Sequence, residues 1–297
     1  MDFDDLTVGS EAAATAADGR TISYREYGDP EGAPVIFHHG TPGSRILPAA
    51  FHETAREASV RLLAPDRPGQ GRSDRAPDAD ALDWADDAAA VADDAGVDRF
   101  GVLGFSGGGR FALACAHEYP ERVTRVATVA ADGPPGAPTD GVGLQNRLLD
   151  VLARRAPPLL RVLFALQART ADGTDPEDAL ALLTDAEPDA LDRRFDGPPI
   201  AQLVALDLRE AFRQGHGAVS REFCASVREW PFDLGDVEAP VRLRHGDDDQ
   251  NVSPATAEYL AARLPDAEAA VLPDEDHLSA LVACHDAALS WLVEPLQ

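Results

Sequence analysis

The sequence predicts an α/β fold: a mostly parallel, doubly wound sheet with a helical insertion. Short apolar runs that end at glycine or proline alternate with segments of helical periodicity up to residue 129, and the pattern resumes at residue 241. Such alternation favours a parallel sheet with helices on both faces. Residues 133–231 contain helical segments but no clear strand pattern. We therefore predict a core built from residues 1–132 and 232–297, with residues 133–231 inserted as a helical cap.

The first part of the predicted core follows an acidic, alanine-rich segment of about 18 residues, which we expect to be disordered or only lightly docked. Residues 21–27 alternate in polarity as a strand does, and they end at Gly28. Gly96 and Pro120 supply stop signals for two helices. The further predicted strands are 35–37, 60–64, 100–103 and 123–129, and the predicted helices are 47–58, 81–95 and 110–119.

The insertion is expected to be helical, with segments at 144–153, 159–168, 176–183 and 200–214. Most of its apolar side chains should form its own core, and some should line a substrate pocket. Among them are Leu159, Leu160, Val162, Leu163, Phe164 and Phe212. The core then resumes with strand 241–245, helix 254–263, strand 269–272 and helix 278–293.

The charge of the chain is strongly unbalanced. Asp and Glu total 52 against 26 Lys plus Arg, which gives a formal net charge of −26, and every one of the 26 is arginine. A uniformly acidic surface without lysine is typical of salt-accumulating halophiles, in which salt screens self-repulsion. A GC-rich codon bias explains the missing lysine but less easily the excess of acid. We favour a halophilic origin, which predicts that the fold is lost below molar salt.

Composition also bounds partners and location. The negative charge argues against nucleic acid and against anionic membrane surfaces. The N-terminus is acidic and has no apolar signal region, and no stretch approaches about 18 uninterrupted apolar residues, so we expect neither a secretory signal nor a membrane span. Cys115, Cys224 and Cys284 are far apart and never in a CxxC pair. We expect buried free thiols in a reducing cytoplasm, and no zinc site.

The central motif is Gly104-Phe105-Ser106-Gly107-Gly108, a GxSxG between a predicted strand and a predicted helix. A serine at so tight a turn takes a strained backbone, and side chains at the neighbouring positions would clash. The free N–H groups that open the following helix favour a developing negative charge. A serine N-cap and a phosphate-binding loop are alternatives, but the spacing is not GxGxxG and a Walker loop needs a lysine. We therefore take Ser106 as the candidate nucleophile.

A serine hydroxyl needs a neighbouring base, and the chain has eight histidines. His277 stands in the loop after the last predicted strand, and catalytic groups collect at the carboxyl ends of parallel strands. His117 and His285 fall inside predicted helices, and His52 and His216 follow no strand end. His277 is therefore the candidate base.

The acid that should orient this imidazole is ambiguous from composition alone. Asp247, Asp248 and Asp249 follow the penultimate predicted strand, and Asp132 follows the strand at 123–129. In so acidic a chain, two of the three consecutive aspartates are expected to be only solvated charge.

Taken together, these motifs resemble the α/β-hydrolase superfamily over nearly the whole chain. In order they are His38–Gly43, Asp66–Ser73, Gly104–Gly108, Gly246–Val252 and His277. The order Ser, Asp, His along the chain is the one that this superfamily uses.

The resemblance implies particular roles. The acid of the superfamily lies midway between a glycine and a valine or isoleucine, and the spacing of Gly246 and Val252 selects Asp249. The first loop of the superfamily supplies one oxyanion N–H, which maps to Thr41, and Gly107 would supply the second. The resemblance gives Asp66–Ser73 a structural role, and we expect His38 and His39 to hold the first loop.

The chain also departs from its relatives. Phe105 stands where many have histidine, and Gly107 where dehalogenases and many cofactor-free haloperoxidases carry a bulkier group. A serine at 106 argues against dehalogenase and epoxide hydrolase activity, which use aspartate there. Asp276 precedes the final histidine where glycine is common.

The resulting hypothesis is a cofactor-free, carboxylesterase-like serine hydrolase that takes a small-molecule acyl substrate. An ester, a lactone, an N-terminal peptide and a substrate of carbon–carbon cleavage all stay open. Two rivals share the scaffold: a small-ligand binding protein with little or no turnover, and a cofactor-free haloperoxidase or perhydrolase.

Overall fold

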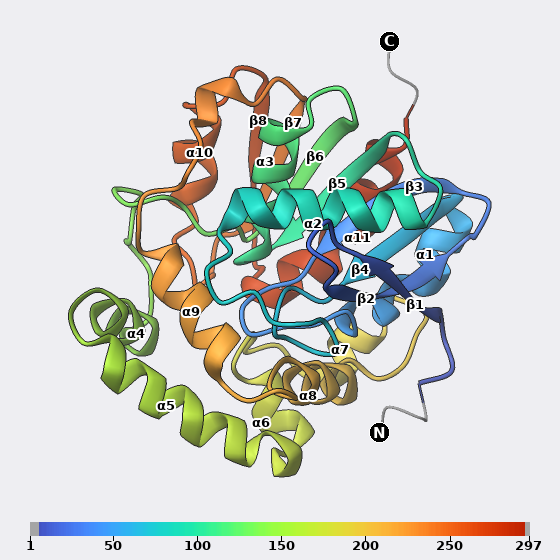
Figure 1. Ribbon diagram of the computed structural model, residues 1–297. Helices are drawn as coiled ribbons and strands as arrows, with labels where there is room; N and C mark the ends of the chain where they lie inside the picture. Colours follow the sequence, from blue (N-terminus) through green and yellow to red (C-terminus); the bar gives the residue numbers. More distant parts are fainter. Residues whose placement is uncertain (1–5, 295–297) are drawn as a thin grey trace.

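The computed structural model describes residues 6–294, which are built around a single mixed sheet (Figure 1). Its strands are β1 Ser10–Thr15, β2 Thr21–Gly28, β3 Ala33–His38, β4 Val60–Pro65, β5 Phe100–Phe105, β6 Val123–Val129, β7 Val241–Gly246 and β8 Ala267–Leu272. Their order in the sheet is β1-β2-β4-β3-β5-β6-β7-β8. β2 runs antiparallel to both β1 and β4, and all later neighbours are parallel. The predicted mostly parallel α/β sheet is confirmed.

The expectation that the first 18 or so residues are disordered or lightly docked is wrong for most of their length. Residues 10–15 form β1, which pairs in register with β2 from Ser10 opposite Glu26 to Thr15 opposite Thr21. Alanine has a low strand propensity, so this strand depends on its partner rather than on its own sequence. Glu11 adds ion pairs to Arg25 and Arg45. Residues 1–5 lie outside the described residues.

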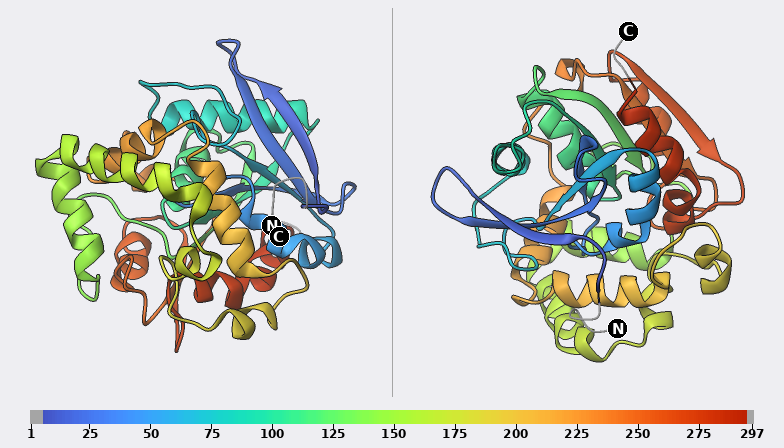
Figure 2. Two further views of the ribbon diagram at one scale, coloured as in Figure 1. Left: turned by 90° about the horizontal axis from the view of Figure 1, so that it is seen from below. Right: turned by 90° about the vertical axis from the view of Figure 1, so that its right-hand side faces the viewer.

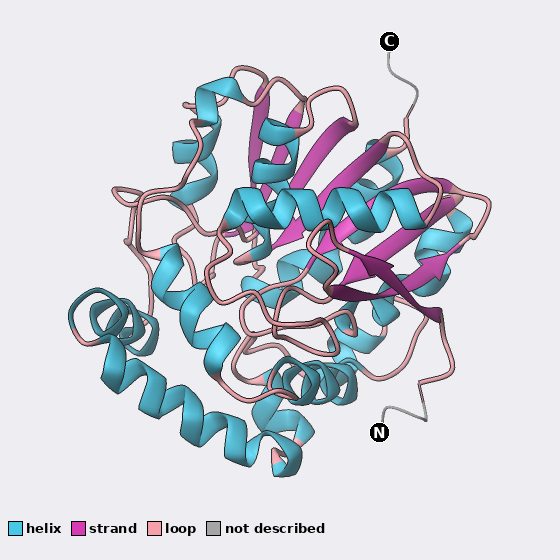
Figure 3. Ribbon diagram, in the orientation of Figure 1, coloured by secondary structure: helices cyan, strands magenta, loops and turns pink. Residues whose placement is uncertain are grey.

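Helices cover both faces of the sheet (Figure 3). α2 Ala81–Asp94, α3 Gly108–Glu118 and α10 Ala255–Ala261 pack in one apolar layer, and α1 His52–Glu57 and α11 His277–Leu292 pack in the other. Alternate strand residues supply the two layers: Phe37 faces the α11 side and Ile36 the α3 side. The predicted helix 47–58 is divided, because Phe51 leaves the α-helical region at φ −106° and Leu47–Phe51 forms a 3-10 helix.

The segment between β6 and β7 contains helices joined by loops, and no strand. Its helices are α4 Leu144–Arg155, α5 Pro157–Thr170, α6 Pro176–Leu180, α7 Pro188–Asp192, α8 Ile200–Ala211 and α9 Gly217–Ser226. In Figures 1 and 2 they gather on one side of the sheet, with α4 and α5 farthest from it. α8 and α9 lie between those two helices and the loops at the strand ends.

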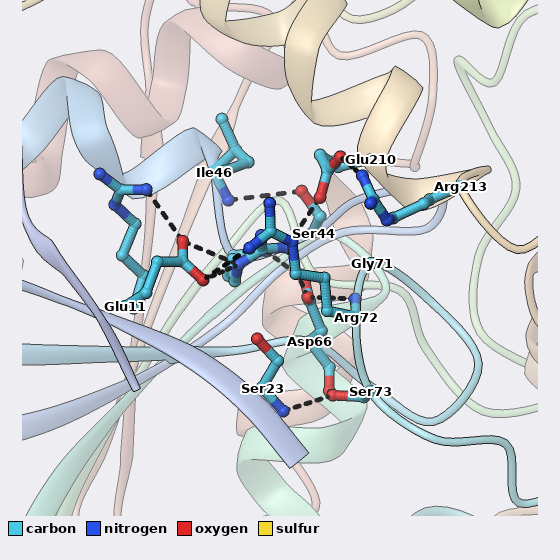
Figure 4. A network of polar contacts seen from close by, with 12 residues as sticks. Glu11, Ser23, Ser44, Ile46, Asp66, Gly71, Arg72, Ser73, Glu210 and Arg213 are labelled. Carbon is cyan, nitrogen blue, oxygen red and sulfur yellow. Dashed lines mark hydrogen bonds and ion pairs between the residues drawn. The ribbon is translucent and has the colours of Figure 1, made fainter. Parts of the chain in front are cut away.

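A buried ionic cluster joins this helical segment to the sheet (Figure 4). Arg45 is fully buried, and its Nη1 lies 2.6 Å from Asp66 Oδ2 and 3.0 Å from Glu210 Oε2 on α8. Its Nε lies 3.1 Å from Glu11 Oε2 on β1. Asp66 also accepts a hydrogen bond from the backbone N–H of Arg72 at 2.9 Å. The loop that begins at Asp66 is thus held by charge-assisted hydrogen bonds from both sides.

Candidate active site

Ser106 sits at a tight bend between β5 and α3. Its φ is +53°, a backbone conformation that costs a side-chain-bearing residue energy and is held by its surroundings. The glycines of the motif make the bend possible: a Cβ on Gly104 would lie 2.7 Å from the carbonyl oxygen of Gly108, and one on Gly108 would lie 1.9 Å from that of His38. Ser106 is only partly buried, so its hydroxyl stays accessible.

His277 and Asp249 meet this hydroxyl in one hydrogen-bonded chain. His277 Nε2 lies 2.9 Å from Ser106 Oγ, and its Nδ1 lies 2.8 Å from Asp249 Oδ2. His277 opens α11 directly after its N-cap, Asp276, whose side chain accepts from the Ser279 N–H while its own N–H donates to Ser279 Oγ in a capping box. The capped first turn of α11 therefore fixes the position of the His277 backbone and with it the position of the imidazole.

Electrostatics favour an ionised acid in this chain. Burial alone would raise the pKa of Asp249, but the His277 charge, followed by hydrogen bonds from His245 and His277, holds that pKa well below its usual range. Its Oδ1 accepts backbone N–H groups from Asn251 at 2.8 Å and Val252 at 3.0 Å. A carboxylate can only accept, so His277 Nδ1 carries the proton and Nε2 is left to accept from Ser106.

The other candidate acids do not bond to the imidazole. Asp247 and Asp248 are exposed, as expected of solvated charge, whereas Asp249 is 2% exposed. Asp132 forms no hydrogen bond with His277, and its side chain has no hydrogen-bond partner among residues 6–294. Of the candidate acids, Asp249 is therefore the one that bonds to the imidazole of His277.

His245 belongs to the site but was not singled out from the sequence. Its Nε2 lies 3.0 Å from Asp249 Oδ2 and 3.2 Å from the carbonyl oxygen of Val252. Both partners are acceptors, so this nitrogen carries a proton and Asp249 receives two imidazole donors. The position of His245 in the strand before the aspartates is the only sequence signal that could have found it.

The two residues expected to bind an oxyanion are also close together. A Cβ on Gly107 would lie 2.9 Å from Thr41 Oγ1 and 3.5 Å from its backbone nitrogen, and one on Gly40 would lie 3.3 Å from Ser106 Cβ. Within residues 6–294, neither the Thr41 nor the Gly107 backbone N–H donates a hydrogen bond. Gly107 is also the N-cap of α3, where the helix dipole favours negative charge.

A buried ion pair holds the loop that carries Thr41. Arg67 is buried, and it donates to the carbonyl oxygens of His39 at 2.6 Å and Gly40 at 2.8 Å. Glu222 on α9 accepts from Arg67 Nε at 2.9 Å and Nη2 at 3.0 Å, and from Thr41 Oγ1 at 3.0 Å. Burial would raise the pKa of Glu222, but the charge of Arg67, its hydrogen bonds and the smaller contributions of His39 and Arg110 together lower that pKa to about 2.

The remaining histidines have no contact with Ser106. His38 accepts from Trp84 Nε1 at 3.1 Å, and burial lowers its pKa to about 3. His39 lies 3.3 Å from the Arg67 backbone nitrogen, beside the loop that it was expected to hold. His285 lies 3.0 Å from Thr54 Oγ1 and stacks on Phe51. These contacts are those of structural residues.

Ser106 and His277 open into a cavity of about 570 Å³. The helical segment supplies much of its apolar wall, with Leu149, Leu163, Phe164, Leu183, Val204 and Phe223 among the lining residues. Of the apolar residues singled out in the sequence, Leu163 and Phe164 line it, whereas Leu159 and Val162 are exposed. A cavity of this size accommodates a small organic molecule.

Three further observations concern the cysteines, possible metal ligands and membrane spans. The cysteines at 115, 224 and 284 are buried and unpaired. Across residues 6–294, no cluster of histidine, cysteine and acidic side chains could hold a metal ion. In the same range, no helix is long and apolar enough to cross a bilayer.

Comparison with known proteins agrees with the fold. The family described as alpha/beta hydrolase fold matches residues 33–283. A non-heme chloroperoxidase of Streptomyces lividans is 29% identical over 83% of this chain and 87% of its own length. A pimeloyl-[acyl-carrier protein] methyl ester esterase of Aromatoleum aromaticum is 30% identical over 78% of this chain and 86% of its own. The structure resembles an esterase from Exiguobacterium antarcticum, with a TM-score of 0.68 and 20% identity over 96% of this chain and 98% of that one.

Proposed function

The chain belongs to the alpha/beta hydrolase family, and from that premise we propose that it is a serine hydrolase of carboxylic esters or related acyl compounds. The observation that carries the proposal is the hydrogen-bonded chain from Ser106 through His277 to Asp249. A nucleophile, a base and an orienting acid in this arrangement are the requirements of two-step acyl transfer.

In the first step, Ser106 Oγ attacks the substrate carbonyl and its proton passes to His277 Nε2. The carbonyl oxygen becomes an oxyanion that the backbone N–H groups of Thr41 and Gly107 would receive. One such donor typically contributes about 3 kcal/mol to lowering the barrier. Collapse of the intermediate expels the alcohol, which takes the proton from His277, and leaves an acyl-serine.

In the second step, His277 removes a proton from water, and the hydroxide attacks the acyl-serine. The second oxyanion occupies the same pair of N–H groups, and its collapse releases the carboxylic acid while Ser106 recovers its proton. Asp249 stays ionised throughout and stabilises the imidazolium that forms in each step. Residues 133–231 act in this proposal as a cap whose apolar side chains hold the acyl group.

The test is a pair of serine variants assayed with p-nitrophenyl butyrate and a fluorophosphonate probe. Ser106→Ala should abolish both turnover and labelling. Ser290→Ala, at an exposed serine of α11, is the matched control and should keep both. Turnover that persists in Ser106→Ala would disprove the assignment. A wild-type chain that the probe leaves unlabelled would favour the small-ligand binding protein instead.

The similarity to a chloroperoxidase favours one second activity on the same acyl-serine. If hydrogen peroxide replaces water as the attacking group, the products are a peracid and free Ser106, with the proton again passing through His277. Perhydrolysis would then require an organic acid or ester and would be lost in Ser106→Ala. An enzyme of this kind should show much perhydrolysis and little ester hydrolysis.

A further inference from the structure

Arg110 is a buried cation on the wall of the cavity that holds Ser106. It lies in the first turn of α3, is 3% exposed and packs its guanidinium over Phe111 at 4.6 Å from the ring centroid. Its Nε and Nη1 are buried and have no hydrogen-bond partner, and its side chain forms no ion pair with any residue from 6 to 294. A buried guanidinium is costly unless an acceptor meets it.

Asp132 lines the same cavity and is likewise unpaired. Its side chain is partly exposed, but Oδ1 is buried without a hydrogen-bond partner among the described residues. Burial raises the pKa of Asp132, and the Arg110 charge opposes that shift more than any other residue does. The two charges therefore interact electrostatically, but the side chains do not form an ion pair.

The backbone of the nucleophile holds both residues beside the reaction centre. The carbonyl oxygen of Ser106 accepts from the N–H of Gly109 at 2.9 Å and from the N–H of Asp132 at 3.4 Å. A Cβ on Gly109 would lie 2.4 Å from that of Ala131, so the start of α3 touches the segment directly after β6. A substrate acylating Ser106 would thus pass close to Arg110 and Asp132.

From this geometry we propose that Arg110 and Asp132 form a recognition subsite for an uncharged polar group, a carboxamide above all, on the acyl part of the substrate. A carboxamide offers an acceptor oxygen to the guanidinium and an N–H donor to the carboxylate. The inference rests on the proposed serine hydrolase activity and names its substrate class: short esters with a terminal amide.

The charge around the cavity favours an amide over a carboxylate. The ionisable residues that line it besides His277 are Arg110, Arg154, Asp132, Asp150, Asp207 and Glu222. Glu222 is already paired with Arg67, and burial raises the pKa of Asp207 to about 7, which leaves Asp132 and Asp150 to balance the two arginines, with no surplus of positive charge to attract an anion. A free carboxylate beside Asp132 would meet like charge, which selects against it.

The experiment compares methyl esters with the same shape and different ends. Methyl succinamate, monomethyl succinate and methyl 4-methylpentanoate end in an amide, a carboxylate and an isopropyl group; a second set is one carbon longer. The release of methanol gives kcat/KM at a salt concentration at which the chain is folded. We expect the amide ester to exceed both others by about tenfold or more at one of the two lengths.

Two variants test whether Arg110 and Asp132 cause the preference for the amide ester. Arg110→Met should bring the ratio of amide to isopropyl ester close to one. Asp132→Asn removes a carboxylate that acts on the guanidinium and would repel an anionic substrate, so it should move the preference toward the carboxylate ester. Arg99→Met, at an exposed arginine outside the cavity wall, is the control and should keep the wild-type ratios. If Arg110→Met does not fold, the shift of preference toward the carboxylate ester in Asp132→Asn still tests the subsite.

The outcomes separate the inference from the function on which it rests. A wild-type chain that hydrolyses none of the esters, and does not react with a fluorophosphonate, contradicts the hydrolase itself. A chain that prefers the isopropyl or carboxylate ester, or whose ratios are unchanged in both variants, stays a hydrolase but has no such subsite.

Discussion

The ion pair between Arg67 and Glu222 should couple the helical segment to the loop that carries Thr41. In Glu222→Gln, the side chain keeps its shape but loses its charge, and its amide faces donors on Arg67, Gln70 and Thr41. Because Arg67 is 1% exposed, the variant leaves a buried cation without its anion. Breaking a buried pair in this way costs about 3–5 kcal/mol. We expect that loss in the free energy of unfolding.

The pKa of Glu222 gives a second measure of how much the ion pair stabilises the fold, and it shows in which direction that stabilisation changes with pH. Its value of about 2 lies below the ordinary 4.5, a difference that corresponds to roughly 3 kcal/mol. Since the folded-state pKa is lowered, the stabilisation is present above about pH 4.5 and is lost as the pH falls toward 2. The wild-type chain should therefore lose more stability between these values than Glu222→Gln does.

Urea unfolding at a series of pH values measures both effects. Glu177→Gln removes an exposed acid of α6 and is the matched control, expected within about 0.5 kcal/mol of the wild type. Ester hydrolysis should fall on the order of tenfold in Glu222→Gln, because the Thr41 hydroxyl and Arg67 lose their charged acceptor and the oxyanion loop loosens. A stability close to that of Glu177→Gln, with the same pH dependence, would refute the reasoning.

Three further predictions concern the acid of the site, the bend at the nucleophile and the charge of the chain. Asp249→Asn should keep the fold but lower kcat by about 10⁴-fold, because the amide favours the wrong imidazole tautomer; a decrease of less than tenfold in steady-state ester hydrolysis would contradict this role. Gly108→Ala should destabilise by about 4 kcal/mol or more, since its Cβ meets the His38 carbonyl, whereas Gly217→Ala, with no atom within 4 Å, should match the wild type in thermal unfolding. With a net charge of −26, the unfolding midpoint should rise steadily as KCl increases from about 0.1 M toward molar levels; a midpoint that is independent of salt would argue against halophilic adaptation.

The elements with strong local signals were predictable from the sequence, and those set by distant contacts were not. β5 is a short apolar run that ends at a glycine motif, and its structure matches its pattern within two residues. β1 carries no such signal, because its alanines favour no strand and only pairing with β2 orders them. Propensity is a weak guide wherever the partner strand decides.

The same division applies to the site. Ser106 and His277 stand at strand ends with recognisable spacing, so sequence alone could single them out. Asp249 needed the family spacing, because burial and not composition distinguishes it from Asp247 and Asp248. The contact between Arg67 and Glu222 joins residues 155 positions apart, and no local sequence pattern predicts such a pair.

The backbone of Ser106 links the bend at the nucleophile to the neighbouring strand and helix. A positive φ is kept only when the surroundings over-determine it, and here the N–H of Ser106 donates to Val129 at 2.9 Å while its carbonyl accepts from Gly109 and Asp132. The same bonds that stabilise the bend therefore fix the start of α3 and the end of β6. Any change that relaxes the bend should also displace Arg110 and Asp132, so losses of turnover and of substrate preference are expected to occur together.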